Sequence, residues 1–427
     1  MIKHSSVKTA ALKTAQKSTR IIGGESDYCA DSFGYTQSDE GLQASYTPVV
    51  FAPFLNVPNV RAAQYLPNLD YAFIIDDEGN HYRWNPVNYR VPVKRGKLTS
   101  ERTFAFGCYH NRADAYAVFS GKTCFVLEGD GTATTTNDQV FHCGDWHKGR
   151  GFLRAETDKF KVYWTGRRVS NLKNDGTVNG SGYVCINPKG GGVLNIIEYG
   201  ERLFLVRESA ISEMVAPGDP RHFRVVTNTR WSLPQVCPDT AVICAGKLWL
   251  CTAEGIYGFD GSSVTCERAD WGGKTYTIEG AAAYAERYIC YNAVCGGEKM
   301  LLEFDTVKKT LTPFAKKYDC VFWMKQGLYA FYDDIGCHME KGKEDPDRVW
   351  TSKGITLGTD AVKTLKYLTA EGNGNAQITV NCGGVERTVS GFGNLPVNLR
   401  GKSFTVTVKG ACNLTNLTAH WEVNDGV

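Results

Sequence analysis

Three observations on this chain predict an all-β fold: a strand pair that recurs seven times, a composition that favours strands and tight turns, and a near absence of helical periodicity. The composition holds 12% aromatic residues, 45 glycines and 5 methionines in 427 residues, which suits strands and turns. Each repeat is an alternating apolar strand, a turn containing glycine or charged residues, and a second apolar strand. The repeats are residues 69–84, 114–129, 158–172, 200–215, 245–259, 285–304 and 318–332.

The spacing of these repeats predicts a β-propeller over residues 46–341. Most repeats begin a similar distance after the one before, and only the last step is clearly shorter. Repeats of about 40 to 50 residues built from four short strands are typical of propeller blades. The predicted number of blades is six to seven, because the last step is short and the first or last blade is open to completion from the other end of the chain.

The first 45 residues lack this repeat. They begin with a basic stretch that favours a short helix over residues 10–16 and continue as a polar, glycine-rich segment without period. Such a segment cannot bury a core of its own and is ordered only against another surface. We expect an extended N-terminal arm over residues 1–45; a disordered or artificial tail is the alternative.

A second domain is predicted after the repeats end. The charged, proline-containing stretch 342–347 indicates a linker. Residues 363–370, 377–380, 386–389, 403–408 and 417–423 then alternate like strands. About five strands in so short a segment predict a small antiparallel β-sandwich over residues 342–427.

Charge and hydropathy exclude several classes of protein. Lysine plus arginine number 48 against 45 acidic residues, a net charge of +3, so no large field of one sign draws the chain to nucleic acid or to an anionic membrane. No apolar run is long enough for a membrane-spanning helix, and the start does not read as a secretory signal. We therefore expect a soluble protein made in the cytosol, with no membrane partner.

The 15 cysteines are predicted to be reduced structural thiols. Cys124, Cys244, Cys251, Cys290 and Cys320 lie inside apolar strand runs, where a free thiol behaves as a small buried hydrophobe. The odd total and the lack of a Cys-x-x-Cys pair also argue against a disulfide framework.

No motif predicts a catalytic site or a cofactor. The run from His142 to His147 is rich in metal ligands, but zinc normally needs a second cluster, and Cys337-His338 is equally isolated. The acidic pairs Asp76-Asp77 and Asp333-Asp334 abut turns and are interpreted as solvated turn residues, although two carboxylates at a propeller axis are the groups that cleave glycosides. The phosphate-loop motifs are incomplete, and the sequence has no Gly-x-Ser-x-Gly nucleophile elbow and no dinucleotide fingerprint in a strand-to-helix context.

Two stretches resemble structural virion proteins of tailed bacteriophages. The first runs from Glu198 to Met214 and continues as Ala216-Pro-Gly-Asp-Pro-Arg-His-Phe, in which a strand pair precedes a Gly-Asp-Pro-x-x-Phe turn. Gly246-Lys-Leu-Trp-Leu followed by Gly255-Ile-Tyr-Gly-Phe-Asp-Gly is similar to a further blade of those proteins. The segments 365–368, 372–380 and 399–404 resemble the small β domain that often closes them.

The resemblance implies a head-tail connector, tail hub or nozzle in the virion, made in the host bacterial cytoplasm. Copies would assemble as a ring around the DNA channel, in contact with portal, adaptor or tail proteins and in non-specific contact with passing DNA. The implied mechanism is assembly without chemistry or cofactor. The predicted interface residues lie on the arm and on the loops at 171–181 and 188–192: Lys13, Arg20, Tyr28, Asn174, Asn179 and Lys189.

Two other classes stay open from sequence alone. One is a carbohydrate-binding or glycoside-cleaving propeller with an accessory sandwich, in which Trp146, Trp231 and Trp271 would stack on sugars. The other is a bacterial surface or scaffold propeller.

Overall fold

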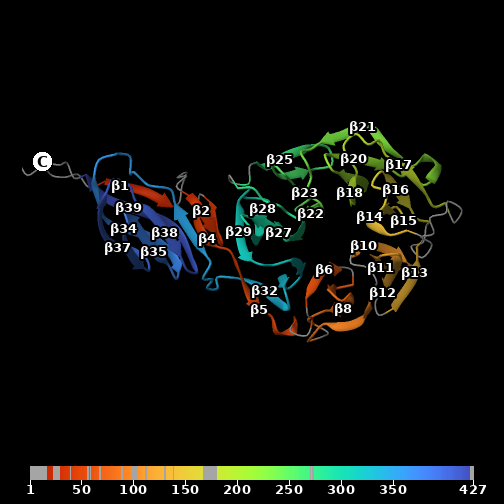
Figure 1. The fold of residues 1–427 in the computed structure, drawn as a ribbon, viewed down its shortest axis with the longest axis horizontal. Coiled ribbons are helices and arrows are strands. Elements are labelled where there is room, and N and C mark those ends of the chain that lie inside the picture. Colours follow the sequence, from red (N-terminus) through yellow and green to blue (C-terminus); the bar gives the residue numbers. More distant parts are fainter. Residues whose placement is uncertain are drawn as a thin grey trace, which may run out of the picture. The chain divides into compact units, whose positions relative to one another are not determined.

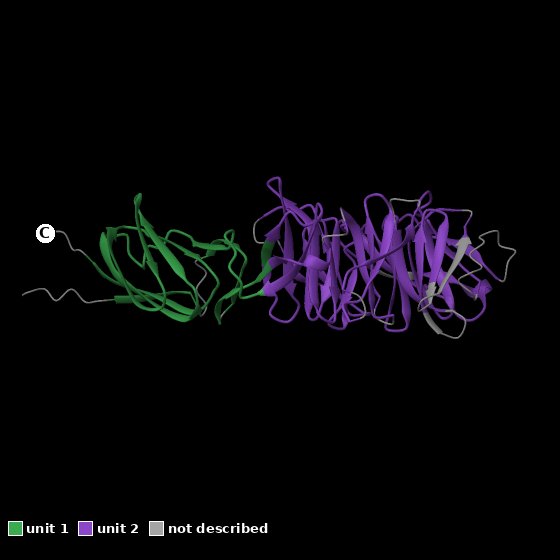
Figure 2. Ribbon diagram, turned by 90° about the horizontal axis from the view of Figure 1, so that it is seen from below, with its two compact units in different colours: residues 1–47, 312–314, 341–427 green, residues 48–311, 315–340 purple. Residues whose placement is uncertain are grey.

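The computed structural model describes residues 17–22, 29–38, 40–54, 57, 59–66, 69–87, 90–98, 103–110, 113–128, 131–137, 139–166, 180–269, 271 and 274–423. Two compact units emerge (Figure 2). The sandwich unit is Met1–Thr47, Thr312–Phe314 and Lys341–Val427, and the propeller unit is Pro48–Leu311 and Ala315–Glu340. Among the described residues, no helix is both long and apolar enough to span a membrane.

The propeller unit has seven four-stranded antiparallel sheets among the residues described. Figure 1 shows them arranged around a centre. Blades 1 to 3 are β6 (Val60–Leu66), β7 (Tyr71–Asp76), β8 (Asn80–Trp84) and β9 (Val93–Lys97); β10 (Thr103–His110), β11 (Ala113–Ser120), β12 (Thr123–Glu128) and β13 (Gly131–Thr136); β14 (Phe141–His147), β15 (Arg150–Ala155), β16 (Lys161–Trp164) and β17 (Gly182–Cys185).

Blades 4 to 6 repeat this order. They are β18 (Val193–Tyr199), β19 (Arg202–Arg207), β20 (Ala210–Val215) and β21 (Arg224–Ser232); β22 (Val242–Cys244), β23 (Lys247–Thr252), β24 (Gly255–Phe259) and β25 (Val264–Ala269); β26 (Gly280–Tyr284), β27 (Arg287–Cys295), β28 (Glu298–Asp305) and β29 (Leu311–Lys316). The predicted propeller is confirmed, and the blade number is resolved as seven for the described chain.

Blade 7 is completed from the other end of the chain. It consists of β30 (Cys320–Met324), β31 (Gly327–Tyr332) and β32 (Ile335–Lys341), and its fourth strand is β5 (Tyr46–Val50). The Phe51 amide also donates to the Gly336 carbonyl at 2.9 Å. A strand from the start of the propeller thus covers the edge that the last blade would otherwise expose, which closes the ring.

The short last step of the sequence repeat has a structural cause. Most repeats found in the sequence fall on the two middle strands of a blade, but residues 318–332 cover β30 and β31, the inner pair of blade 7. The middle pair of blade 6 begins at Arg287 and that of blade 7 at Gly327, a step close to those between the earlier blades. The true period is therefore kept to the end of the ring.

The sandwich unit consists of two antiparallel sheets. One is β3 (Tyr35–Ser38), β4 (Gly41–Ala44), β39 (Cys412–Val423), β34 (Lys363–Gly374) and β37 (Gly393–Gly401), with β1 (Lys17–Ile22) also paired to β39. The other is β2 (Cys29–Phe33), β33 (Val349–Ser352), β38 (Thr405–Lys409), β35 (Gln377–Cys382) and β36 (Val385–Ser390). Alternate residues of the two sheets, such as Leu368, Ile378 and Val408, fill one core.

The described part of the predicted arm forms strands of the sandwich. β1 and β4 pair with β39, β3 pairs with β4, and β2 pairs with β33. Ile21, Ile22, Tyr35 and Leu42 are buried in the sandwich core. Because β33 and β39 lie near the other end of the sequence, no local pattern announces these pairings. The predicted helix over residues 10–16 lies outside the described residues.

A buried arginine binds the segment that leads into β5. Arg348 is fully buried and donates to the carbonyls of Gly34 (3.1 Å), Lys343 (2.8 Å) and Ser45 (3.2 Å), and to the Thr47 hydroxyl (2.6 Å). Gly34 has φ +71°, and a Cβ there would lie 3.0 Å from Arg348 Cγ, so this position requires glycine. The arginine ties the stretch before β5 to the stretch after β32.

Replacing this guanidinium should destabilise the protein. In Arg348→Lys one ammonium cannot reach four acceptors, and buried carbonyls lose their donors, so we expect the free energy of unfolding to fall by about 2 kcal/mol or more. Denaturant unfolding measures this, with Arg387→Lys on exposed β36 as the matched control. Equal midpoints for the two variants would show that the Arg348 contacts do not stabilise the fold.

Candidate functional site

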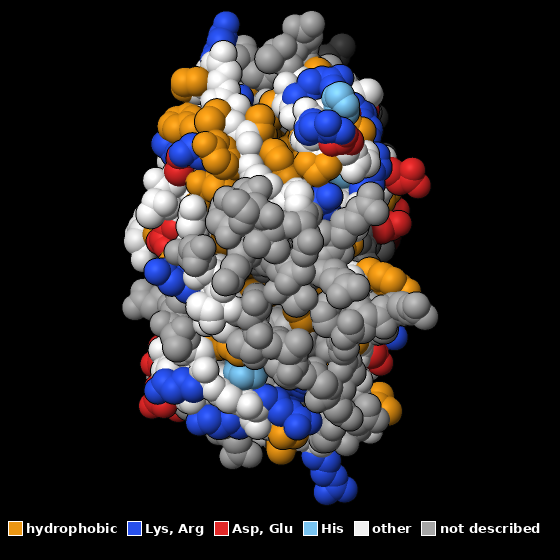
Figure 3. All heavy atoms as spheres, turned by 90° about the vertical axis from the view of Figure 1, so that its right-hand side faces the viewer, with side chains coloured by type: hydrophobic (Ala, Val, Ile, Leu, Met, Phe, Trp, Pro, Cys, Tyr) orange, Lys and Arg blue, Asp and Glu red, His pale blue; other side chains and the backbone are white. Residues whose placement is uncertain are grey.

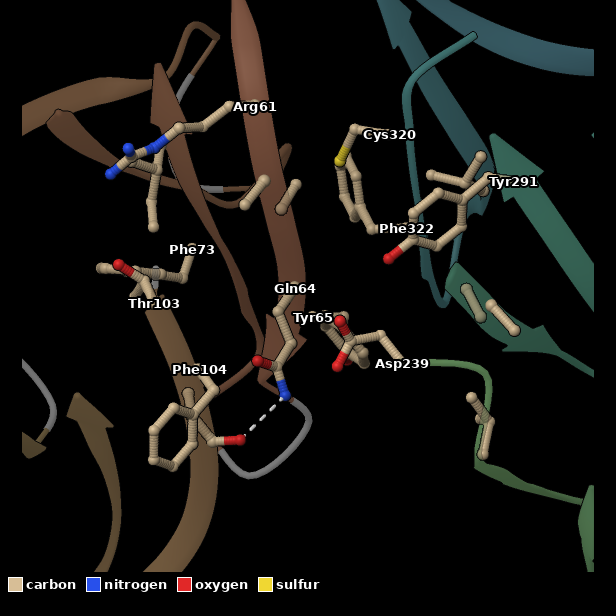
Figure 4. Close-up of a pocket in the computed structure, with 18 of the residues that line it drawn as sticks. Arg61, Gln64, Tyr65, Phe73, Thr103, Phe104, Asp239, Tyr291, Cys320 and Phe322 are labelled. Carbon is tan, nitrogen blue, oxygen red and sulfur yellow. Dashed lines mark hydrogen bonds between the residues drawn. The ribbon is translucent and has the colours of Figure 1, made fainter. Parts of the chain in front are cut away.

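The inner strands of the seven blades surround a central cavity of about 910 Å³. Each of β6, β10, β14, β18, β22, β26 and β30 contributes lining residues. Figure 4 shows the hydroxyl of Tyr291 directed into this space, and the Gln64 amide donating to the Ala105 carbonyl at 3.4 Å. The volume falls in the range of about 300 to 1,000 Å³ that holds small molecules.

One mouth of the cavity is polar. Because every complete blade has four antiparallel strands in the same order, all inner strands run in the same direction and begin at the same face. Most of the polar lining residues lie within three residues of these starts: Arg61, Thr103, His142, Asn195, Asp239 and Glu279, whereas Gln64 lies further along β6. Asp77, in the turn between β7 and β8, belongs to the same mouth.

The walls of the cavity are small or aromatic. Alanines line it on β6, β10 and β26, where larger side chains would fill the space. Phe104, Tyr291 and Trp323 line it with part of their surface exposed. The arrangement can therefore hold a small ligand between aromatic walls with polar contacts at one end.

The acidic pairs singled out in the sequence do not form a catalytic dyad. Asp76 was interpreted as a solvated turn residue, but it is fully buried and accepts from the Asn80 amide (2.7 Å) and from the Tyr82 hydroxyl (3.0 Å). It holds the β7–β8 turn together. Asp333 and Asp334 lie in the exposed β31–β32 turn, as the sequence predicted.

The two candidate metal clusters are dispersed in the structure. No group of three or more His, Cys, Asp or Glu side chains suited to a metal ion is found in the described part of the chain. His142 lines the central cavity, whereas His147 is buried against Glu198 with 3.3 Å between Nδ1 and Oε2. His338 lies 3.6 Å from Glu340, its own neighbour on β32.

A half-buried aspartate lies at the junction of blades 3 and 4. Asp145 on β14 accepts from its neighbour Trp146 (2.8 Å) and from the Glu198 amide of β18 (2.6 Å). Burial raises the pKa of Asp145 to about 7, and the Glu198 charge adds to this. Burial lowers the pKa of His147 beside it. Sequence reasoning missed this group, because only the packing of two blades encloses it.

The predicted interface residues are only partly described. Lys13, Tyr28, Asn174 and Asn179 lie outside the described residues. Arg20 is exposed on β1 and donates to the Thr415 carbonyl at 3.4 Å. Lys189 is exposed in the turn before β18, where its amide donates to Asn187 Oδ1 at 2.8 Å. Arg20 belongs to the sandwich unit and Lys189 to the propeller unit.

The tryptophans considered for sugar stacking have structural roles. Trp271 is buried and its indole donates to the Thr252 carbonyl at 3.3 Å, so it is not placed to stack on a sugar. Trp231 packs on Phe259 with ring centroids 4.8 Å apart. Trp146 packs against the core between blades 2 and 3.

The prediction of free thiols is confirmed. All 15 cysteines are unbridged, and Cys124, Cys244, Cys251, Cys290 and Cys320 are buried. Cys251 and Cys290 lie on neighbouring blades with their sulfurs 3.4 Å apart. Burial holds the pKa of Cys251 well above its usual value, which keeps it a thiol.

The Gly-Asp-Pro-x-x-Phe turn has a clear physical role. Asp219 caps a short 3₁₀ helix over Pro220–His222 by accepting from the Arg221 amide at 2.9 Å. The helix delivers Phe223 into the core between blades 3 and 4, where its ring centroid lies 5.0 Å from Trp164 and 5.7 Å from Phe152. The motif is therefore a plug between blades.

The order of the hydrogen-bonded strands in each sheet identifies the architecture. The described part of the chain forms a seven-bladed β-propeller and a β-sandwich. No protein-family model and no curated protein matches it. Among solved structures it is similar to the β-propeller domain of Cps50 (Swd1) from Myceliophteria thermophila, with 8% identity and a TM-score of 0.47 over 69% of this chain and 98% of that one.

Two further solved structures show similar values. The RRP9 WD40 repeats match with 9% identity and a TM-score of 0.41 over 69% of this chain and 97% of that one. A chain of the Mitotic Checkpoint Complex matches with 11% identity and a TM-score of 0.42 over 70% and 94%. The Trp-Asp dipeptide that marks WD40 blades does not occur in this sequence.

The raised pKa of Asp145 predicts a pH dependence of stability. Its pKa is about 7 in the folded chain and about 4 when unfolded, so the folded chain retains the proton between these values. Stability from this group is therefore lost as pH rises from about 4 to 7, by roughly 2 to 4 kcal/mol. His147, whose pKa is lowered, acts in the opposite sense, so only a comparison of variants isolates Asp145.

Thermal unfolding between pH 4 and 7 measures this effect. Asp145→Asn removes the titration, so its melting temperature should fall less with rising pH than that of the wild type. Asp334→Asn, in an exposed turn, should keep the wild-type slope. Parallel profiles for all three proteins would show that the Asp145 carboxyl titrates normally.

Proposed function

We propose that this chain is a non-enzymatic structural subunit of a tailed-phage particle, of the head-tail connector, tail hub or nozzle kind, that assembles with its own copies into a ring. The observation that carries the proposal is the likeness of residues 198–223 and 246–261 to such virion proteins. These residues form the end of β18, the strands β19 and β20 with Phe223 after them, and the strands β23 and β24. Each stretch thus covers the two middle strands of one blade.

The construction of the chain supports a passive structural role. A closed propeller leaves few strand edges open, and the Arg348 contacts fix the segment that closes it. Among the described residues, the acidic residues and potential metal ligands considered for catalysis either stabilise turns through hydrogen bonds or are dispersed in the structure. A rigid body of this kind suits an assembly subunit.

The central cavity places a limit on how DNA would pass. At about 910 Å³ it has the size of a small-molecule site. A DNA duplex would therefore pass through the opening enclosed by the assembled copies of the chain, and not through the centre of a single propeller. A net charge of +3 suits a wall that DNA passes without being held. Figure 3 shows lysine and arginine in separate groups among hydrophobic and acidic side chains on the face it presents.

The proposed contacts between copies need one revision. The described residues between 17 and 46 belong to the sandwich and to blade 7, so they cannot also be a free arm. Only the basic stretch 1–16, which lies outside the described residues, remains as the proposed tie to a neighbour. Lys189 and the adjoining turn remain the proposed contact on the propeller.

The mass of the purified protein in solution tests the proposal. Native mass spectrometry and negative-stain microscopy should give a closed ring of several copies, alone or after mixing with the other virion proteins. A persistent monomer that does not enter particles would overturn the proposal.

Two variants test where the contacts lie. Deletion of residues 1–16 and the substitution Lys189→Glu should each lower the assembled fraction by about tenfold or more, since a reversed charge at a contact costs on the order of 1.4 kcal/mol or more. Lys122→Glu, in the exposed β11–β12 turn, serves as the control and should assemble normally. Unchanged assembly of both variants would exclude these contacts.

A further inference from the structure

We propose that the central cavity of the propeller is a binding site for a small ligand that carries a primary ammonium group. The inference concerns the inside of one propeller, so it goes beyond the structural role proposed above and does not depend on it. It rests on the size of the cavity, the charges at its polar mouth and the aromatic side chains of its walls.

The cavity has room that small side chains create. Ala62 and Ala63 on β6, Ala105 on β10 and residues 281–283 on β26 line it, and bulkier residues at these positions would fill the channel as they do in other closed β structures. The resulting volume of about 910 Å³ lies within the range of small-molecule sites. A ligand of several carbon atoms therefore fits.

The charges that line the cavity favour a cation. Asp77, Asp239 and Glu279 contribute three carboxylates, and Arg61 is the one lysine or arginine among the described lining residues. Asp77 accepts from the Asn59 amide group at 3.2 Å and Glu279 from that of Asn292 at 3.1 Å.

These asparagine partners are neutral. No described lysine or arginine pairs with Asp77 or Glu279, so within the described residues these two carboxylates have hydrogen-bond partners but no ion-pair partner. A bound cation would supply the missing partner in a site partly shielded from water, where the attraction exceeds that at an open surface.

The aromatic walls add a second attraction for the same kind of ligand. Phe104, Tyr291 and Trp323 line the cavity, and the face of an aromatic ring attracts an ammonium within about 6 Å. The Tyr291 hydroxyl, directed into the space in Figure 4, is able to accept one of the three ammonium protons. The apolar part of the ligand would rest on the rings and alanines.

The same residues disfavour other ligands. An anion would be repelled by three carboxylates and attracted by one guanidinium among the described lining residues, so its binding is disfavoured. A bare metal ion finds no group of three suitable side chains in the described residues. An alkyl ammonium combines the positive charge and the apolar stem that this lining accepts.

Calorimetric titration at low ionic strength tests the proposal, with diaminopentane as the probe and pentanediol as its neutral counterpart. The full-length protein should bind the diamine saturably and the diol at least about tenfold more weakly. The double variant Asp239→Asn, Glu279→Gln should weaken diamine binding by about tenfold or more. Glu386→Gln on exposed β36 is the control and should bind like the wild type.

A steric variant keeps the test decisive if the double variant folds poorly. Gln64→Trp fills the cavity from an exposed lining position without touching the carboxylates, and it should abolish diamine binding while the melting temperature stays close to wild type. The proposal is overturned if the diamine does not bind saturably, if the diol binds as well, or if neither Gln64→Trp nor the double variant weakens binding.

Discussion

Closure of the propeller by β5 is the constraint on which the rest of the structure depends. The chain first supplies β1 to β4 to the sandwich and only then enters the ring as the outer strand of blade 7. It returns to the sandwich after β32, and Arg348 binds the backbone of both crossings through neutral carbonyl and hydroxyl acceptors. A fully buried charge is tolerated here because four of the five N–H donors of the guanidinium make hydrogen bonds. Closure therefore links the two ends of the sequence, and neither unit is built from one continuous segment.

Convergence of seven inner strands explains where the polar groups of interest lie. Inner strands that all begin at one face gather residues from distant repeats, so that Asp77, Asp239 and Glu279 share one mouth. The junction of blades 3 and 4 similarly encloses Asp145 against the β18 backbone. Closure in this way gathers acidic residues of several blades at one mouth, whereas the buried Asp76 of a single turn makes its hydrogen bonds within that turn.

The motifs that suggested a virion protein have a structural role in the blades and in the packing between them. Asp219 caps the short helix, and Phe223 plugs the space between two blades. Such motifs report how blades are joined, while function depends on which surfaces meet a partner. The assembly proposal consequently depends on whether copies of the chain form a ring. The cavity proposal depends on the lining of a single propeller, so each proposal can be correct or wrong without the other.

The sequence by itself determined the local features of this protein. Alternation and turn residues, which are read within a few positions, predicted the middle strands of most blades, the strands at 363–370 and 417–423, and the buried free thiols. Tertiary structure decided the rest: the pairing of β5 with β32, the recruitment of Ile21, Tyr35 and Leu42 into the sandwich, and the cavity. These features join residues from distant parts of the chain, and a local pattern carries no record of its distant partner. Only closure of the ring brings such residues into contact.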